Sequence, residues 1–520
     1  MTTNMKKYSF LFLILVLFLS GCESFLNRDP VSDLSPSNFF KDKAEMANWN
    51  AGIYDAFQNA LSKRQVLFGD VRSDNVTGTS YEDNKLYMNA LVPNISEANW
   101  QPFYECITRC NVGISRYPTI PNILESEYAS YIGQCYGMRA YMYFWATRAW
   151  GKLPIVTEEW DGSLDNITIP RSSLEDVKKQ ILDDINRAIY YFNISSPQEK
   201  CYLGLDAMYA LLTEVYMWYN DYEEALKASD HFIGHKTLAL SNGEVEWKSI
   251  FTKSSDSKEV IFLMAWDYET DGALSGWPQL LGAGNTNNGY RMTQEIFNEF
   301  VDRLRSGEGT DARFWNTLDT VAIYYSASRV PITYASYDAT TNGPVNKCVK
   351  YSDIDPEREF DSNNQVYKSY FKVLTTESNE TDLVMMRMAN VMLLRAEALN
   401  KLGRGAEALT IVNDIRQRVG YLRDAMLDVS SASDVNQVEK VILDERQLEL
   451  WGEGYRWFDL MRTGHLVEVM DPVYSQRQEN AGVTVTGFGN EGTKYWPIYY
   501  KEFESNKALV GDQNPPYTER

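Results

Sequence analysis

Apolar residues recur at helical spacing along most of the chain, and the clearest example is the stretch from Val441 to Gly464. Its apolar residues lie three, four or seven positions apart, which places them on one helical face: Val441, Leu448, Trp451, Tyr455 and Phe458. Gly452 and Gly454 interrupt this stripe and predict a tight corner between two helices. Gly464 predicts the cap of the second helix.

Charged residues fill the other faces of the same stretch, at spacings that let opposite charges meet. They are Asp444, Glu445, Arg446, Glu449, Glu453, Arg456, Asp459 and Arg462. The charges are either catalytic or part of a buried ion-pair lattice that clamps the two helices. No histidine, serine or cysteine lies among them to act as a nucleophile, so we predict the lattice.

This stretch resembles the signature of a known protein family. Its pattern, ER-x-LEL-x-x-EG-x-RW-x-DL-x-R-x-G, is similar to that of the SusD/RagB family, the surface glycan-binding lipoproteins of Gram-negative nutrient-uptake systems. The segment FLNRDPVSDLSPSNFF from Phe25 and the ending QNPPY at Tyr517 resemble the family's two ends, with Pro516 where the family usually has glycine. The resemblance is weakest over about 69–99 and 272–382, the parts expected to vary with ligand.

Two helix pairs resemble tetratricopeptide repeats. The first spans Leu205 to Phe232 with a turn at Asn220-Asp221, and the second spans Met392 to Arg418 with a turn at Gly403 to Gly405. The pairs are far apart in sequence, so something else must interrupt the superhelix that they form.

Further helices are predicted for 100–118 and 128–151, and another opens at Ser172 or Ser173. In the second of these, Gly133 and Gly137 form a small-residue edge that lets a neighbouring helix approach closely. The aromatic residues beside that edge follow helical spacing and are predicted to belong to the core.

Two regions lack sustained helical periodicity, about 67–99 and 243–383, although SKEVIFLMAWDYE in the second predicts a strand. Both are rich in aromatic and hydrogen-bonding residues. Aromatic faces stack on pyranose rings while Asn, Asp and Arg bind hydroxyl groups. The candidate ligand-binding residues are therefore Asp70, Arg72, Asp74, Asn75, Tyr81, Trp277, Tyr290, Arg291 and Trp315. For each of them an ordinary loop or core role stays open as the alternative.

The predicted fold class is all-α. Tetratricopeptide-like helix pairs form a superhelical scaffold over about 35–66, 100–242 and 384–520. An irregular, loop-rich ligand-binding insertion carries a few short strands. Residues 22–520 are expected to form one SusD-like domain.

The first 21 residues are predicted to be a lipoprotein signal peptide. Lys6 and Lys7 precede an apolar run from Phe10 to Leu19 that is too short to span a bilayer. The following LSGC resembles a lipobox, which implies diacylation of Cys22 and anchoring in a membrane. Glu23 does not resemble the inner-membrane retention signal, so we expect the outer membrane. Exposure at the cell surface is implied by the family resemblance.

Composition favours binding over catalysis. The chain of 520 residues has 34 Tyr and 13 Trp but three His, which gives much stacking surface and few groups that titrate near neutrality. Its net charge of −21 gives it no electrostatic reason to bind nucleic acid. No GxSxG, P-loop or HExxH motif is present.

Metal and disulfide sites are not expected. His231 and His235 are four residues apart and could begin a zinc site on one helical face, but no third ligand is evident nearby in the sequence. Five cysteines follow Cys22, at 106, 110, 135, 201 and 348, and we interpret them as small core thiols. No cofactor is predicted.

The resemblance implies a function without bond cleavage. The protein would capture an oligosaccharide and pass it to a SusC-like TonB-dependent transporter in the outer membrane. Two alternatives stay open, a lipid-anchored glycan hydrolase and a peptide-binding member of the same family.

Overall fold

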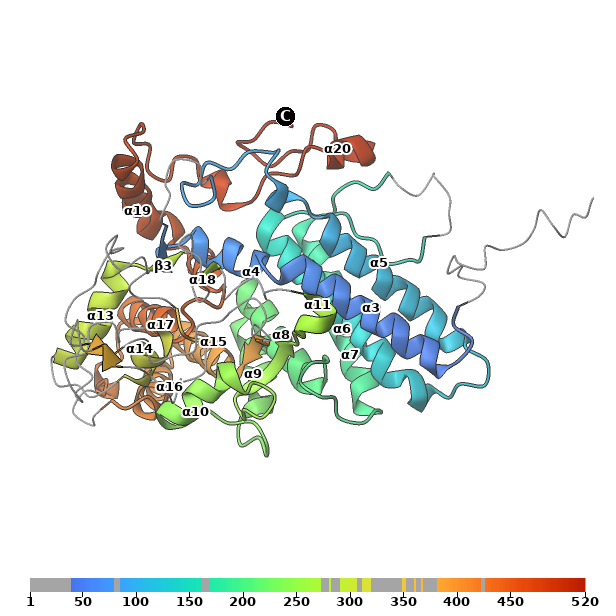
Figure 1. Ribbon diagram of the computed structural model, residues 1–520, viewed down its shortest axis with the longest axis horizontal. Coiled ribbons are helices and arrows are strands. Elements are labelled where there is room, and N and C mark those ends of the chain that lie inside the picture. Colours follow the sequence, from blue (N-terminus) through green and yellow to red (C-terminus); the bar gives the residue numbers. More distant parts are fainter. Residues whose placement is uncertain are drawn as a thin grey trace, which may run out of the picture.

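The computed structural model describes residues 39–78, 85–160, 168–272, 280–281, 290–305, 311–318, 348–351, 360–361, 366–367, 381–421 and 426–519. These residues form a mainly helical body with six short strands, which confirms the all-α prediction (Figure 1). No helix within these ranges has both the length and the apolar character needed to cross a membrane.

The N-terminal half is a layer of long helices that pack side by side (Figure 1). They are α3 (Lys43–Leu61), α5 (Gln101–Arg116), α6 (Glu125–Trp150) and α7 (Leu174–Asn193). Asp42 caps α3 by accepting hydrogen bonds from the backbone N–H groups of Ala44 and Glu45. Ser173 caps α7 in the same way through the N–H group of Asp176.

Helix α6 lies at the centre of this layer and is buried from Ile132 to Trp150. The small-residue edge predicted for it allows close packing. A Cβ atom at Gly133 would lie 3.0 Å from the Phe192 ring, and one at Gly137 would lie 2.9 Å from the Met208 sulfur. Any larger residue at these positions would push α7 or α8 away.

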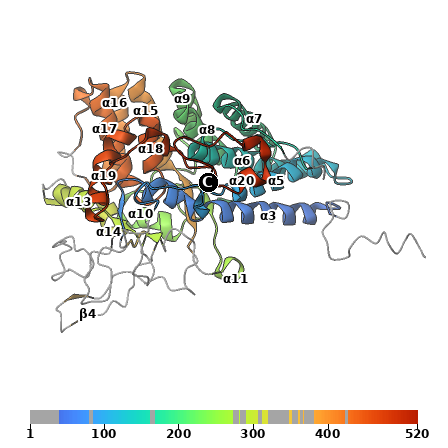
Figure 2. The same cartoon turned by 90° about the horizontal axis from the view of Figure 1, so that it is seen from above.

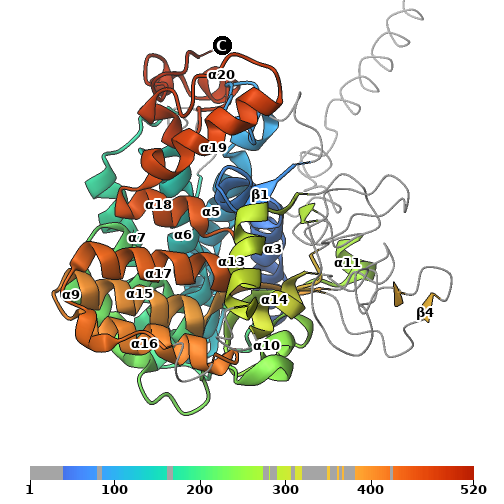
Figure 3. The ribbon, with the colours of Figure 1, turned by 90° about the vertical axis from the view of Figure 1, so that its left-hand side faces the viewer.

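The two predicted helix pairs are α8 (Leu205–Trp218) with α9 (Tyr222–Ser229), and α15 (Met388–Lys401) with α16 (Gly405–Arg418). They share a buried cluster that includes Met217, Leu226 and Leu393. Helix α17 (Val435–Glu449) packs on the second pair, and α17, α15 and α16 lie stacked in Figure 3. The repeats therefore meet in space despite the long insertion between them, as a superhelical scaffold requires.

The described part of the insertion joins the scaffold through short antiparallel strands. The predicted strand is β2 (Val260–Met264), which pairs with β6 (Leu383–Arg387). The other pairs are β1 (Val76–Thr77) with β3 (Arg291–Met292) and β4 (Phe360–Asp361) with β5 (Val366–Tyr367). Four further helices belong to the described part of this region: α10 (Gly243–Thr252), α11 (Tyr268–Asp271), α13 (Gln294–Arg305) and α14 (Ala312–Thr317).

The remaining elements cover one edge of the scaffold. Next to α3 lie α4 (Arg64–Val66) and a single π-helical turn, η1 (Leu67–Val71). The C-terminal elements are α18 (Arg456–Thr463), α19 (Leu466–Asn480) and α20 (Glu502–Ser505). Helix α11 (Tyr268–Asp271) lies on the side of the molecule opposite α7 and α9 (Figure 2).

The predicted ion-pair lattice is present and extends beyond two helices. Glu445, Glu449 and Glu453 are fully buried, and basic side chains from α14, β6 and α16 surround them. An Arg313 Nη1 atom lies 2.6 Å from Glu445 Oε1 and 3.2 Å from Glu449 Oε2. Arg387 bridges Glu449 at 2.6 Å and Glu453 at 2.8 Å.

Further basic groups complete the lattice around the same glutamates. Arg416 pairs with Glu445 at 2.7 Å, and Arg418 pairs with Glu449. Both Arg387 and Arg418 also contact Glu259, which precedes β2. The lattice therefore joins α17, which we call the signature helix, to the second helix pair and to the central strands β2 and β6.

Glycines shape the corner that follows this lattice. The backbone φ angles of Gly452, Gly454 and Gly464 are +76°, +83° and +82°, which confirms the predicted corner and cap. The residue that packs against Gly454 was not predicted. Gly69 in η1 lies so close to it that a Cβ atom there would overlap the Gly454 carbonyl group.

We predict that Glu449→Gln strongly destabilises the protein. The substitution removes the charge that compensates buried Arg387 and Arg418, and breaking a buried pair on one side costs about 3–5 kcal/mol. Urea unfolding followed by tryptophan fluorescence measures the loss. Glu407→Gln, which removes an exposed partner of Arg404, is the matched control and should leave the unfolding midpoint unchanged. Equal effects of the two variants would contradict a central role for the lattice.

We also predict that acid weakens the fold between about pH 5 and pH 2. Burial alone would raise the pKa of Glu445, but its ion pairs outweigh burial and lower it to about 2. Since this pKa lies below the unfolded value, the stabilisation is complete above about pH 4.5 and is lost as the pH falls. Ionised Glu445 alone then contributes about 3 kcal/mol to the free energy of unfolding at neutral pH.

Two other carboxyl groups make the free energy of unfolding fall, rather than rise, as the pH increases above about 4. Burial raises the pKa values of Asp70 and Glu502 to about 7, so their ionisation destabilises the fold as the pH rises from about 4 to 7. Urea unfolding across pH 2–8 at constant ionic strength should therefore give the highest free energy of unfolding at about pH 5. A stability that rises steadily from pH 5 to pH 8 would contradict this assignment.

Candidate functional site

Three candidate ligand residues from the first variable region face inwards. Asp70, Arg72 and Asn75 are at most 1% exposed. Asp70 accepts hydrogen bonds from Asn75 Nδ2 at 2.6 Å and from the Gly454 backbone N–H group at 2.5 Å. Arg72 donates to the Thr493 carbonyl oxygen at 2.5 Å. In this structure the three side chains fix the segment to the C-terminal part of the chain and offer no surface to a ligand.

Asp74 is the fourth candidate of this segment and is half-buried. Both of its carboxylate oxygens lie 2.8 Å from the Arg456 guanidinium, and Gln447 donates to it at 2.9 Å. Burial would raise the pKa of Asp74, but the Arg456 ion pair outweighs burial and lowers it. Helices α17 and α18 thus provide the partners of this loop acid, Gln447 and Arg456.

The strand pair β1–β3 joins the two regions in which ligand residues were predicted. Thr77 pairs with Arg291 in the ladder. Arg291 is 7% exposed, whereas Tyr290 just before it is half-buried and its ring centroid lies 6.4 Å from that of Tyr87. Tyr290 is therefore the candidate whose ring stands at the described surface of this junction.

The other predicted residues fall outside the described side chains. Tyr81, Trp277 and the lipidation candidate Cys22 lie outside the described residues. Trp315 lies in α14, but its side chain is also outside them. Their predicted roles stay predictions.

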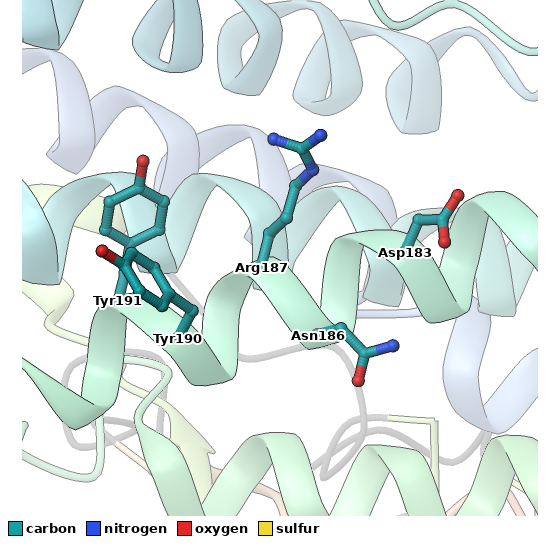
Figure 4. Close-up of a pocket in the computed structure, with 5 residues that line it drawn as sticks. All are labelled: Asp183, Asn186, Arg187, Tyr190 and Tyr191. Carbon is teal, nitrogen blue, oxygen red and sulfur yellow. The ribbon is translucent and has the colours of Figure 1, made fainter.

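A groove on the outer face of α7 was not predicted. It has a volume of about 540 Å³ and is lined by Asp183, Asn186, Arg187, Tyr190 and Tyr191 (Figure 4). Tyr190 is 54% exposed, and the ring of Tyr191 stacks at 6.0 Å on Tyr136 of α6. The sequence signal for this groove would have been the exposed Tyr190 beside the polar residues Asp183, Asn186 and Arg187 of the same helix.

The structure also brings three metal-ligating side chains together. His231 and His235 do not share a helical face, because the chain turns at Gly234, which has a φ angle of +67°. Both rings nevertheless meet Asp206 in the first turn of α8, and one ligand atom of each residue lies within 4.8 Å of the others. No third ligand was evident near the two histidines in the sequence, because Asp206 lies 25 residues before His231 and the packing of α8 against α9 brings it there.

Comparison with known families covers nearly the whole chain. The SusD family model matches residues 251–517, which is more than half of the 520 residues. A second model, described as starch-binding associating with outer membrane, matches residues 24–217.

Relatives and solved structures agree with this assignment. The chain is 29% identical to SusD-like protein P38 of Formosa agariphila, over 99% of its own length and 100% of the relative's. It is 27% identical to SusD-like protein P2 of the same organism, over 92% and 94%. A crystal structure of a SusD superfamily protein from Bacteroides vulgatus shares the fold, with a TM-score of 0.70 and 19% identity over 90% of this chain and 98% of that one. The chain therefore belongs to the SusD family.

Proposed function

We propose that the protein is a lipid-anchored glycan-binding protein of the outer membrane that captures oligosaccharides and passes them to a TonB-dependent transporter. The observation that carries this proposal is the family match, which extends over both halves of the chain. The description of the second family model, starch-binding associating with outer membrane, supports both the ligand class and the location.

The proposed ligand contacts come from the two variable regions. Tyr290 supplies a half-buried ring at the β1–β3 junction, and Tyr81, Trp277 and Trp315 are proposed as further stacking residues. We propose an indirect role for Asp70, Arg72, Asp74 and Asn75, because they fix to the scaffold the segment that precedes Tyr81. The β1–β3 pairing would keep the Tyr290 ring in place and so lower the entropy cost of binding.

Binding without cleavage is part of this proposal. A glycosidase needs two carboxyl groups that face the sugar, about 5–10 Å apart. Three neighbouring acids of the signature stretch, Glu445, Glu449 and Glu453, are instead buried and face arginine and lysine side chains. These glutamates form ion pairs inside the protein and do not face a bound sugar, which supports a binding protein over a hydrolase.

We predict that Trp277→Ala and Trp315→Ala each weaken polysaccharide binding about tenfold or more. Loss of one well-packed stacking ring removes about 1–3 kcal/mol of binding free energy. Affinity electrophoresis against a panel of neutral and charged polysaccharides measures the effect as lost retardation. Tyr290→Ala should weaken retardation by the same polysaccharide.

The matched control for this experiment is Tyr190→Ala in the α7 groove, which also removes an exposed ring. It should retain wild-type retardation. Loss of retardation in Tyr190→Ala alone would move the site to α7 and contradict the proposed contacts. Reducing ends released from the same polysaccharides would favour the hydrolase alternative, and binding of peptides with no polysaccharide hit would favour the peptide-binding one.

We predict that Cys22→Ala releases the protein from the outer membrane. Without its thiol the chain cannot be acylated at residue 22, and among its described residues no helix could replace the lipid as an anchor. Fractionation of cells that express the variant should show the protein absent from the outer-membrane fraction. Cys201→Ser, at a half-buried cysteine, is the control and should stay in the membrane fraction.

A further inference from the structure

The cluster of Asp206, His231 and His235 lies outside all the contacts proposed for glycan binding. His231 Nε2 lies 2.7 Å from Asp206 Oδ1, and His235 Nε2 lies 3.3 Å from the same oxygen. All three side chains are partly exposed, so an ion from solvent can reach them. The cluster joins the start of α8 to the turn that follows α9.

The two rings are held in position before any ion binds. His231 stacks on Tyr209 of α8, with ring centroids 4.1 Å apart and planes 12° from parallel. His235 Nδ1 accepts hydrogen bonds from the backbone N–H groups of Leu238 at 3.1 Å and Thr237 at 3.3 Å. The stack on Tyr209 does not depend on the tautomer, so His231 loses little freedom when it coordinates an ion.

We propose that Asp206, His231 and His235 bind one Zn²⁺ ion, with solvent in the fourth position. Two imidazoles and one carboxylate are a common zinc ligand set, and three protein ligands leave a tetrahedral site open to water. Zinc–ligand bonds of about 2.0–2.1 Å place neighbouring donor atoms about 3.3 Å apart. The His235–Asp206 distance already has this value, and the His231–Asp206 distance needs to lengthen by about 0.6 Å.

Binding requires both histidines to change tautomer. The Asp206 carboxylate only accepts hydrogen bonds, so the Nε2 atoms of His231 and His235 carry the protons that they donate to it. Zinc takes both Nε2 lone pairs, so the proton of each ring moves to its Nδ1 atom, and the N–H groups of Thr237 and Leu238 lose the His235 acceptor. Thr237 is exposed, so water can replace the acceptor there. The ion thus replaces the two histidine–aspartate hydrogen bonds and these two backbone hydrogen bonds by three coordinate bonds between α8 and this turn.

Isothermal titration of the purified protein with ZnCl₂, under reducing conditions, tests the proposal. We expect one equivalent of Zn²⁺ to bind and the thermal unfolding midpoint to rise. Ca²⁺ and Mg²⁺ should not compete, because they prefer oxygen ligands. Amide hydrogen exchange at Thr237 and Leu238 should increase on zinc binding, which a merely nonspecific surface ion would not cause.

Two variants change the ligands while they keep the fold, and a third is their control. His231→Phe preserves the stack on Tyr209, and His235→Asn keeps a side-chain acceptor for the backbone. Each should weaken zinc binding at least about 100-fold, more than the loss of an outer-shell partner does. His465→Gln alters the remaining histidine, which pairs with Glu439 and Glu468, and should bind zinc like the wild type.

Either of two results would overturn the proposal. The first is no saturable zinc binding below about 100 µM, which would leave a hydrogen-bonded cluster only. The second is undiminished binding by folded His231→Phe and His235→Asn, which would place the ion elsewhere. Unchanged unfolding midpoints of the metal-free variants establish that they are folded.

Discussion

The buried charges of Glu445, Glu449 and Glu453 are the constraint on which the rest of the structure depends. Hydrophobic packing brings helices together but allows many nearly equivalent arrangements. A guanidinium that bridges two carboxylates is directional, and leaving one of the charges unpaired inside the protein is costly. Arg387 and Arg418 reach two elements at once, the signature helix and Glu259 beside β2. One arrangement of helices and strands therefore satisfies all of these charges.

The lattice also explains why an irregular insertion can sit within a helical scaffold. The central strands β2 and β6 pair near the two ends of the insertion, and Arg387 at the end of β6 is anchored to α17. Arg313 of α14 reaches the same glutamates from within the insertion. The ends of the insertion are thus fixed to the scaffold by charge. The chain between these anchors carries the predicted aromatic ligand residues.

The scaffold was predictable because its signals are local. Apolar periodicity, capping residues and glycine corners act over a few residues, and they identified α6, the two helix pairs and the corner at Gly452 and Gly454. The lattice was predictable for the same reason, since its acids follow one helix. Its arginine partners at 313 and 387 were not assigned, because a side chain's distant partner leaves no pattern in its own neighbourhood.

The ligand residues were harder to predict for a related physical reason. Asp70, Arg72 and Asn75 have the composition of an exposed loop, but partners beyond residue 450 bury two of them directly. Polar residues in a turn-rich segment serve equally well as ligand contacts or as internal hydrogen bonds, and only the fold distinguishes the two. Asp206 shows the converse case, since an ordinary acid in a first helical turn becomes the third member of a histidine cluster through helix packing.

The close contact between Gly69 and Gly454 has a consequence for how the protein matures. The two backbones meet without side chains between them, and Gln65, Asp70 and Arg72 bind chain segments more than 380 residues further on. Contacts of such sequence separation form late in folding. An exported chain cannot close this seam until its last quarter has crossed the inner membrane. The segment from Gln65 to Arg72 therefore lacks its final partners during translocation. Periplasmic chaperones would protect it most in that period.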